Sequence, residues 1–196
     1  MAHIPAVQRR QQLVAAAFRV VAREGVAAAS TRRIASEAKV PPAVVHYCFH
    51  SVEELLDALM ASVFADAAEA AAVALRCSGA VEHSLRAAVR RLWASYQDDP
   101  ARYRAAIDLI AHALRRPAAT MIVREYQYTL GSLAERFLVD VAVRNKTTWR
   151  SPTEVLGRLL ISTVDGVLMC WLIDRDDAKT EAALDWLTAT LSAEAR

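Results

Sequence analysis

Glycine and proline are scarce in this chain, and their positions limit where its secondary structure can begin and end. Only five glycines and six prolines occur among 196 residues, and the prolines stand where helical patterns should begin or end. The stretches between them are rich in Ala, Leu, Arg and Glu, which are strong helix formers. This pattern argues against a large β-sheet and predicts an all-α fold.

Hydrophobic residues recur at helical spacing in nine segments, so we expect about nine helices. Gly25 should end the first helix, Ser30 or Thr31 should cap the second, and Ser51 and Glu54 have the spacing of a capping box. The expected helices span residues 6–24, 32–38, 42–48, 51–76, 81–97, a segment beginning at 100, 118–143, 152–173 and 178–193.

The net charge of the chain is only +2, but it is unevenly distributed. Residues 1–50 carry seven Lys and Arg side chains against two acidic ones, whereas the remainder carries 17 basic and 20 acidic side chains. A basic N-terminal segment on a mildly acidic remainder suggests that this segment binds a polyanion. The alternative is a solvated surface with randomly placed charges.

The first three expected helices have the layout of a helix-turn-helix, since one long helix precedes two short ones separated by a tight turn at 39–40. The helix 42–48 should then enter the major groove of DNA, while the turn and the helix starts contact phosphates. Arg32 and Arg33 can make charge-assisted contacts. Tyr47 can donate its hydroxyl to a phosphate or place its ring against a thymine methyl.

The segment 30–49 reads STRRIASEAKVPPAVVHYCF. It resembles the DNA-binding segment of the tetracycline-repressor (TetR) family, and so do Arg9–Arg10, Ala15–Phe18 and Glu24–Gly25 before it and Ser51–Leu56 after it. The resemblance covers about residues 7–60. A late Asp165–Gly166 and the helix count also fit the body of that family.

The resemblance implies a homodimer that binds a palindromic double-stranded DNA operator, often as a repressor, and releases it when a small-molecule effector enters the body. It implies a DNA-binding domain at 1–50 and a ligand-sensing and dimerisation domain at 51–196, linked mechanically by the helix that begins near 51. The residues expected at the DNA are Ser30, Thr31, Arg32, Arg33, Lys39, Pro42, Ala43, Val44, His46 and Tyr47.

Three positions depart from the family pattern. Lys39 stands where a turn glycine is usual, His46 where a tyrosine is usual, and Val52 where a lysine usually supplies a phosphate contact. Few side chains of helix 42–48 can form hydrogen bonds, so we expect operator preference to depend on thymine methyls, Arg32 and DNA shape. The alternative function is a helical small-molecule-binding protein whose DNA-binding segment no longer binds DNA.

The last two expected helices are strongly apolar, and helix 152–173 is apolar nearly all round. A four-helix interface with a second copy would bury this surface. The alternative is that helix 152–173 is the central core helix of one chain. The expected interface residues are Leu160, Val164, Leu168, Trp171, Leu184, Leu187 and Leu191.

An effector pocket in the body should combine apolar walls with a few polar groups. Asp165 is the most informative candidate because it interrupts an apolar stretch, and a buried carboxylate needs a partner. It could pair across a dimer, bind a cationic ligand or face water, and each candidate could instead belong to the core or the surface. The candidates are Trp93, Tyr96, Tyr103, His112, Tyr126 and Asp165.

Other classes of site find little support. His46, Cys48 and His50 lack the further ligands that zinc needs, so we expect no metal. Asp108 and His112 could form part of a catalytic triad but more often form a local helix pair. Neither a serine-elbow motif nor a glycine-rich phosphate loop occurs, and we expect neither an enzyme nor a cofactor.

The sequence also gives an expectation for the cellular compartment. Its three cysteines have no paired spacing and should be reduced thiols. Its first twelve residues lack the apolar stretch of a signal peptide, and we expect no apolar run of the ~18 residues that a membrane helix needs. We therefore expect a soluble, cytoplasmic protein with no membrane partner.

Overall fold

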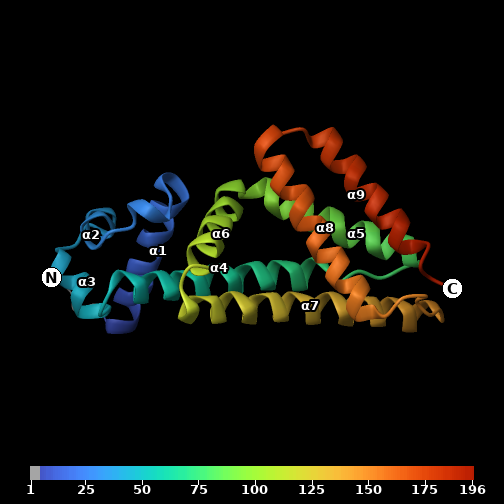
Figure 1. The fold of residues 1–196 in the computed structure, drawn as a ribbon, viewed down its shortest axis with the longest axis horizontal. Helices are drawn as coiled ribbons and strands as arrows, with labels where there is room; N and C mark the ends of the chain where they lie inside the picture. Colours follow the sequence, from blue (N-terminus) through green and yellow to red (C-terminus); the bar gives the residue numbers. More distant parts are fainter. Residues whose placement is uncertain (1–4) are drawn as a thin grey trace. The chain divides into compact units, whose positions relative to one another are not determined.

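A computed structural model describes residues 5–196 and confirms the all-α prediction (Figure 1). Within this range, the boundaries of the nine α-helices lie within one or two residues of the expected ones. The described residues form a single isolated β-bridge, between Trp149 and Ala195. The helices are α1 (Ala6–Glu24), α2 (Thr31–Ala38), α3 (Pro42–Cys48), α4 (Val52–Ala74), α5 (Val81–Asp98), α6 (Pro100–Ala113), α7 (Pro117–Asn145), α8 (Thr153–Asp174) and α9 (Asp177–Ser192), with a short 3-10 helix, η1 (Val26–Ala28).

The chain forms two compact units. The N-terminal unit comprises the chain up to Asp66 together with Ala101–Arg124, and the C-terminal unit comprises Ala67–Pro100 and Glu125–Arg196. α6 and the start of α7 thus belong with α1–α3, although they follow α5 in the chain. The helices α4 and α7 each run from one unit into the other without a break.

The N-terminal unit is built from α1, α2 and α3 around a small apolar core. Leu13, Val20, Ile34, Val45 and Phe49 are at most 1% exposed, and burying each such side chain contributes ~1.5–3 kcal/mol. The helix ends follow the expected local chemistry. The Ser30 hydroxyl accepts a hydrogen bond from the Arg33 N–H (3.2 Å), and Gly25 has a φ of +83° where α1 ends.

Two side chains of α6 attach to the C-terminal end of α1. The Asp108 carboxylate accepts a 2.6 Å hydrogen bond from the Val26 N–H, and the Arg104 guanidinium donates to the Ala22 carbonyl at 2.8 Å. The expected local pairing of Asp108 with His112 is therefore replaced by a bond to a backbone 82 residues earlier. These bonds fix the loop that leads from α1 into α2.

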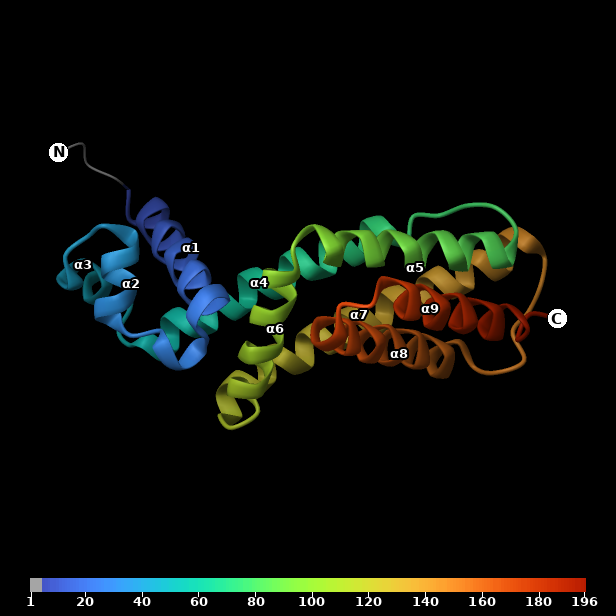
Figure 2. The same cartoon turned by 90° about the horizontal axis from the view of Figure 1, so that it is seen from above.

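The C-terminal unit is a helical bundle in which α9 lies against both α5 and α8 (Figure 2). The Trp93 and Trp171 rings meet edge to face with centroids 4.8 Å apart, which joins α5 to α8. Gly157 lets α8 approach α7 closely, because a Cβ there would lie 3.3 Å from the Glu135 nitrogen. The Trp149 indole N–H donates to the Leu138 carbonyl at 2.9 Å.

The side chains expected at a dimer interface belong instead to the core of the single chain. Each of them is at most 5% exposed, so it has almost no surface left to bury against a second copy. The reason is that α8 and α9 turn one apolar face toward α5 and toward each other. The residues are Leu160, Val164, Leu168, Trp171, Leu184, Leu187 and Leu191.

α8 also corrects the expectation about membrane-length segments. Among the described residues it is the one helix that is long and apolar enough to cross a membrane by length and composition, because the charge of Asp165 interrupts the run without making it polar on average. The core helix of a soluble protein passes the same test. Six α8 residues are buried inside this chain, and about a third of its apolar window is buried, so part of the helix stays exposed.

Candidate DNA-binding surface and effector cavity

The helix α3 presents the expected recognition face to solvent. Val45 and Cys48 point into the core, whereas Tyr47 is 82% exposed. Pro42, Ala43 and His46 are also exposed, and Val44 is half-buried. Pro42 occupies the first helical position, where its missing N–H is not needed. The exposed face therefore offers apolar groups, one imidazole and one phenol.

The turn between α2 and α3 is made by Lys39 in a left-handed conformation. Its φ is +57° and ψ is +44°, and its N–H bonds to the carbonyls of Ala35 and Ser36. A side chain in this conformation costs on the order of 1 kcal/mol relative to glycine. Lys39 is exposed at the turn between the two helices, where a phosphate contact could offset that cost.

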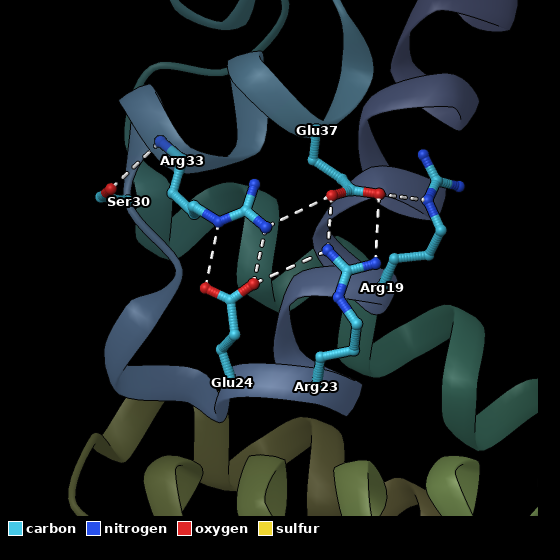
Figure 3. A network of polar contacts seen from close by, with 6 residues as sticks. All are labelled: Arg19, Arg23, Glu24, Ser30, Arg33 and Glu37. Carbon is cyan, nitrogen blue, oxygen red and sulfur yellow. Dashed lines mark hydrogen bonds and ion pairs between the residues drawn. The ribbon is translucent and has the colours of Figure 1, made fainter.

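An ion-pair network joins α1 to α2 (Figure 3). The Glu37 carboxylate contacts Arg19 (2.8 Å), Arg23 (2.5 Å) and Arg33 (3.4 Å), and Glu24 contacts Arg33 at 2.6 Å. These hydrogen bonds, first from Arg23 and then from Arg19, lower the pKa of Glu37 to about 2.

The network separates the roles of the two neighbouring arginines in α2. Arg33 is held by two carboxylates, so its side chain orders α2 against α1. Arg32 is exposed and takes no part in the network (Figure 3). Ser30 and Thr31 stand at the start of α2, exposed and half-buried respectively, and the Ser30 hydroxyl is already used as the helix cap.

The start of α4 carries half of the expected capping box. Ser51 Oγ accepts from the Glu54 N–H at 3.0 Å, but the Glu54 carboxylate reaches the N–H of His50 (2.7 Å) instead of that of Ser51. Glu54 also pairs with Arg10 at 3.0 Å, and Arg10 stacks on the Phe49 ring. Bonds from the His50 backbone, the His50 ring and Arg10 lower the pKa of Glu54 to about 2.

The C-terminal unit contains a small cavity that brings Tyr96 and Asp165 together. Its volume is about 40 Å³. Burial raises the pKa of Asp165 to about 6, and burial followed by the nearby Asp165 charge raises that of Tyr96. The other lining residues are all apolar: Ala67, Ala71, Leu75, Leu92, Leu130, Ala134, Leu160, Ile161 and Val164.

The remaining four pocket candidates do not line this cavity. Trp93 is 4% exposed and packs on Trp171, and its indole N–H has no hydrogen-bond partner. Tyr103 and His112 lie on α6 in the N-terminal unit, and Tyr126 lies half-buried on α7. The apolar lining of α4 and α7 was not expected as a pocket, because nothing local distinguishes these alanines and leucines from core residues.

A larger hollow of about 630 Å³ lies in the N-terminal unit along α1 and α4. It is open to solvent, and its charged groups are already matched: Arg102 pairs with Asp66, and Arg10 with Glu54. The C-terminal cavity is smaller, but it is lined from four helices and contains a half-buried carboxyl, that of Asp165. We therefore consider the cavity around Asp165 the better candidate for effector recognition.

The His46–Cys48–His50 spacing does not produce a cluster. Cys48 is buried, whereas His46 and His50 are exposed and the His50 ring contacts Glu54 at 2.9 Å. Over residues 5–196 no group of three or more His, Cys, Asp or Glu side chains is placed to hold a metal ion.

The fold and the α2–turn–α3 geometry define a helix-turn-helix transcription regulator. The sequence pattern described as "Bacterial regulatory proteins, tetR family" matches residues 13–59. The HTH-type nicotine-responsive transcriptional repressor HdnoR of Paenarthrobacter nicotinovorans is 31% identical over 182 residues, which cover 93% of each protein. The chain belongs to the TetR family.

Solved structures share the fold over nearly the whole chain. A transcriptional regulator of Pseudomonas aeruginosa PAO1 has a TM-score of 0.80 at 16% sequence identity. The superposition covers 97% of this chain and 93% of the regulator's chain. The multidrug binding protein EbrR, solved in complex with imidazole, has a TM-score of 0.68 at 26% sequence identity. Here the superposition covers 93% of this chain and 94% of the EbrR chain. Both cover the N-terminal and the C-terminal unit.

Proposed function

We propose that this regulator is a repressor that binds a palindromic operator as a homodimer and is released by a small molecule. The observation that carries the proposal is the α2–turn–α3 surface, where Arg32 and Tyr47 are exposed while Arg33 is held by carboxylates. A surface ordered in this way can place α3 in the major groove without first rearranging its own ion pairs.

The response to a small molecule is supported by the relatives and by the C-terminal cavity. HdnoR is described as nicotine-responsive and EbrR as a multidrug binding protein. In this chain we assign the effector site to the cavity of Tyr96 and Asp165. The lining includes Ala67 and Ala71 of α4, the helix that begins directly after α3. An effector that displaces α4 would thereby favour one arrangement of the DNA-binding surface over another.

The dimer is supported by apolar side chains that α8 and α9 leave exposed. Ile173 is 79% exposed and Trp186 is 68% exposed, and Leu159 and Met169 lie on the same outer face of α8. Gly166 leaves open space on that face, which would allow a close approach of a second helix. We propose these exposed residues as the interface in place of the buried residues of α8 and α9 expected from the sequence. A regulator of this kind would act in the cytoplasm.

Selection of random duplexes by the purified protein tests the proposal. We expect an enriched palindrome, with binding that weakens steeply as salt rises because phosphate contacts release counterions. Arg32→Ala should weaken operator binding by about 5- to 150-fold, which corresponds to the ~1–3 kcal/mol of a good base contact. Operator release by a small molecule would then complete the assignment.

Two results would contradict the proposal. If no sequence is enriched and weak binding disappears on adding salt, the protein would be a small-molecule binder that has lost its DNA-binding role. If Arg32→Ala leaves operator binding unchanged, the assignment of the surface is wrong. Lys179→Ala, which removes a cation from α9 on the other unit, is the matched control and should bind DNA normally.

A further inference from the structure

We propose that Arg10 of α1 positions the recognition helix α3 by holding its carboxyl end against the start of α4. Arg10 then acts on DNA binding through α3 and not through a DNA contact of its own. This inference rests on the proposed function in taking α3 as the helix that reads the operator. It goes beyond the proposed function by assigning a role to a side chain outside the exposed face of α3.

The guanidinium of Arg10 contacts two residues where α3 ends. Its Nη1 donates a hydrogen bond to the Cys48 carbonyl, and its central carbon lies 4.0 Å from the centroid of the Phe49 ring. Carbonyls in the last turn of a helix have no N–H partner within that helix. A cation that donates to one of them also interacts favourably with the helix dipole. Arg10 therefore caps α3 from another helix.

The other terminal nitrogen of Arg10 joins this cap to α4. Nη2 pairs with the Glu54 carboxylate at 3.0 Å, and that carboxylate accepts a 2.7 Å hydrogen bond from the His50 N–H. Arg10 and Glu54 thus hold three consecutive residues, 48–50, where α3 ends and the connection to α4 begins. All of these residues belong to the N-terminal unit.

The helix α3 needs such an anchor because it is short. It has seven residues, and an isolated helix of this length is not stable in water. Its buried side chains are those of Val45 and Cys48, and its N-cap residue, Pro41, makes no side-chain cap hydrogen bond. His46 and Tyr47 directly precede Cys48, so a tilt of the carboxyl end would move both exposed groups. Groups that form a binding site must be held within about 0.5 Å of their working position.

Arginine is the side chain that suits this position. Its planar guanidinium can lay one face on an aromatic ring while two nitrogens donate in different directions. Lysine keeps the positive charge, but its ammonium is a point charge on a flexible stem and cannot keep all three contacts. Arg10→Lys therefore distinguishes two roles. A direct contact of residue 10 with a phosphate would survive the substitution, whereas the positioning of α3 would not.

The test measures binding to the selected operator and to a scrambled duplex of the same composition. Arg10→Lys should bind the operator at least ~10-fold more weakly than the wild type, as for about one lost base contact, and the scrambled duplex within ~2-fold. Its melting temperature should stay within ~4 °C of the wild type, because a partly exposed ion pair contributes little. Arg86→Lys is the matched control and should bind like the wild type, since Arg86 pairs with Glu82 on α5, outside the N-terminal unit.

Glu54 gives a second test, in which charge alone predicts the opposite result. Removing an acidic group from the DNA-binding unit should strengthen DNA binding if only charge matters. Because Glu54 helps Arg10 to hold α3, Glu54→Gln should instead weaken operator binding by at least ~3-fold. Glu53→Gln makes the same change at the neighbouring exposed position and should not weaken binding. Arg10→Lys and Glu54→Gln combined should lose less than the sum of the two, since both break the same connection.

Three results would overturn the inference while leaving the proposed function intact. The first is an Arg10→Lys variant that binds the operator like the wild type. The second is an Arg10→Lys variant that loses affinity equally for the operator and the scrambled duplex. The third is a Glu54→Gln variant that binds the operator no more weakly than Glu53→Gln does.

If no operator is selected, the proposed function fails and hydrogen exchange decides the inference without DNA. The Phe49 N–H bonds to the Val45 carbonyl at the end of α3, and its exchange should accelerate in Arg10→Lys. Exchange of the Ile34 amide in α2 should stay the same and serves as the internal control. Unchanged exchange at Phe49 would show that Arg10 does not hold α3.

Discussion

The two units of the molecule each contain carboxyl groups with shifted pKa values, and the shifts of Glu37 and Glu24 are opposite in direction to that of Asp165. In the N-terminal unit, Glu37 and Glu24 are surrounded by arginines at the surface, and the pKa of each carboxyl lies below its usual value. In the C-terminal unit, Asp165 is half-buried among apolar side chains, and this burial raises its pKa above the usual value. Ionised Glu37 and Glu24 thus favour folding, whereas ionised Asp165 opposes it.

This difference indicates how the two units divide their work. The DNA-binding surface is ordered by its own ion pairs, so little has to change when it meets a phosphate backbone. The C-terminal unit holds the Asp165 carboxyl in surroundings that disfavour its ionised form. A ligand that binds one arrangement of this unit more tightly than another would shift the conformational equilibrium toward that arrangement.

The largest expected effect comes from Asp165→Asn. The folded protein holds the Asp165 proton more tightly than the unfolded chain does, so wild-type stability falls as pH rises from about 4 to above 6. At pH 7.5 the variant should be more stable by on the order of 2–3 kcal/mol. Urea unfolding of both proteins across this pH range measures the difference in stability. A stability gain of Asp165→Asn that persists unchanged at pH 4 would contradict this explanation. The same gain in Asp140→Asn, which makes the same chemical change at an exposed position of α7, would contradict it as well.

Removing the Asp108 carboxylate should weaken the N-terminal unit. Asp108→Ala leaves the Val26 N–H without its 2.6 Å acceptor, which should cost ~1–2 kcal/mol of unfolding free energy. Hydrogen exchange of the Val26 amide should accelerate in parallel. Asp108→Asn retains an acceptor oxygen and should lose less. Equal losses in the two variants would show that the hydrogen bond contributes little.

Lys39→Gly should raise the stability of the protein while lowering its affinity for DNA. Glycine accepts the φ of +57° without strain, so the variant should gain ~0.5–1 kcal/mol of stability while losing a cation near the DNA. Lys39→Ala loses the same charge but keeps the strain. We expect the two variants to bind DNA equally weakly and to differ in urea midpoint. A less stable glycine variant would argue against strain at this turn.

The smallest effect is expected from Glu37→Gln, because the arginines that pair with Glu37 are about half-exposed. The melting temperature should drop slightly at low salt. It should drop less at 1 M salt, because the Debye screening length is then only ~3 Å. The contribution of Glu37 is present above pH ~4.5 and is lost as pH falls toward its folded pKa of about 2. Glu181→Gln on α9 is the control, and its melting temperature should show no such salt dependence. If the melting temperature of Glu37→Gln drops equally at low and high salt, the loss would come from packing instead of the ion pairs.

Features that depend on residues close together in the chain could be predicted from the sequence. The helix boundaries, the cap at Ser30, the stop at Gly25 and the exposed face of α3 follow from propensities and hydrogen bonds over a few residues. The resemblance at 30–49 also identified the family, because these residues form one continuous segment.

Contacts between residues far apart in the chain became visible only in the folded protein. Arg33 and Arg32 are adjacent, yet Arg33 reaches Glu24 and Glu37 while Arg32 stays exposed, and helical periodicity does not reveal this difference. Similarly, the pattern showed that α8 and α9 are apolar, but not that Leu168 and Leu187 face their own chain while Ile173 faces solvent. Tyr96 and Asp165 meet across 68 intervening residues because four helices pack there, and packing depends on the shapes of all the partners at once.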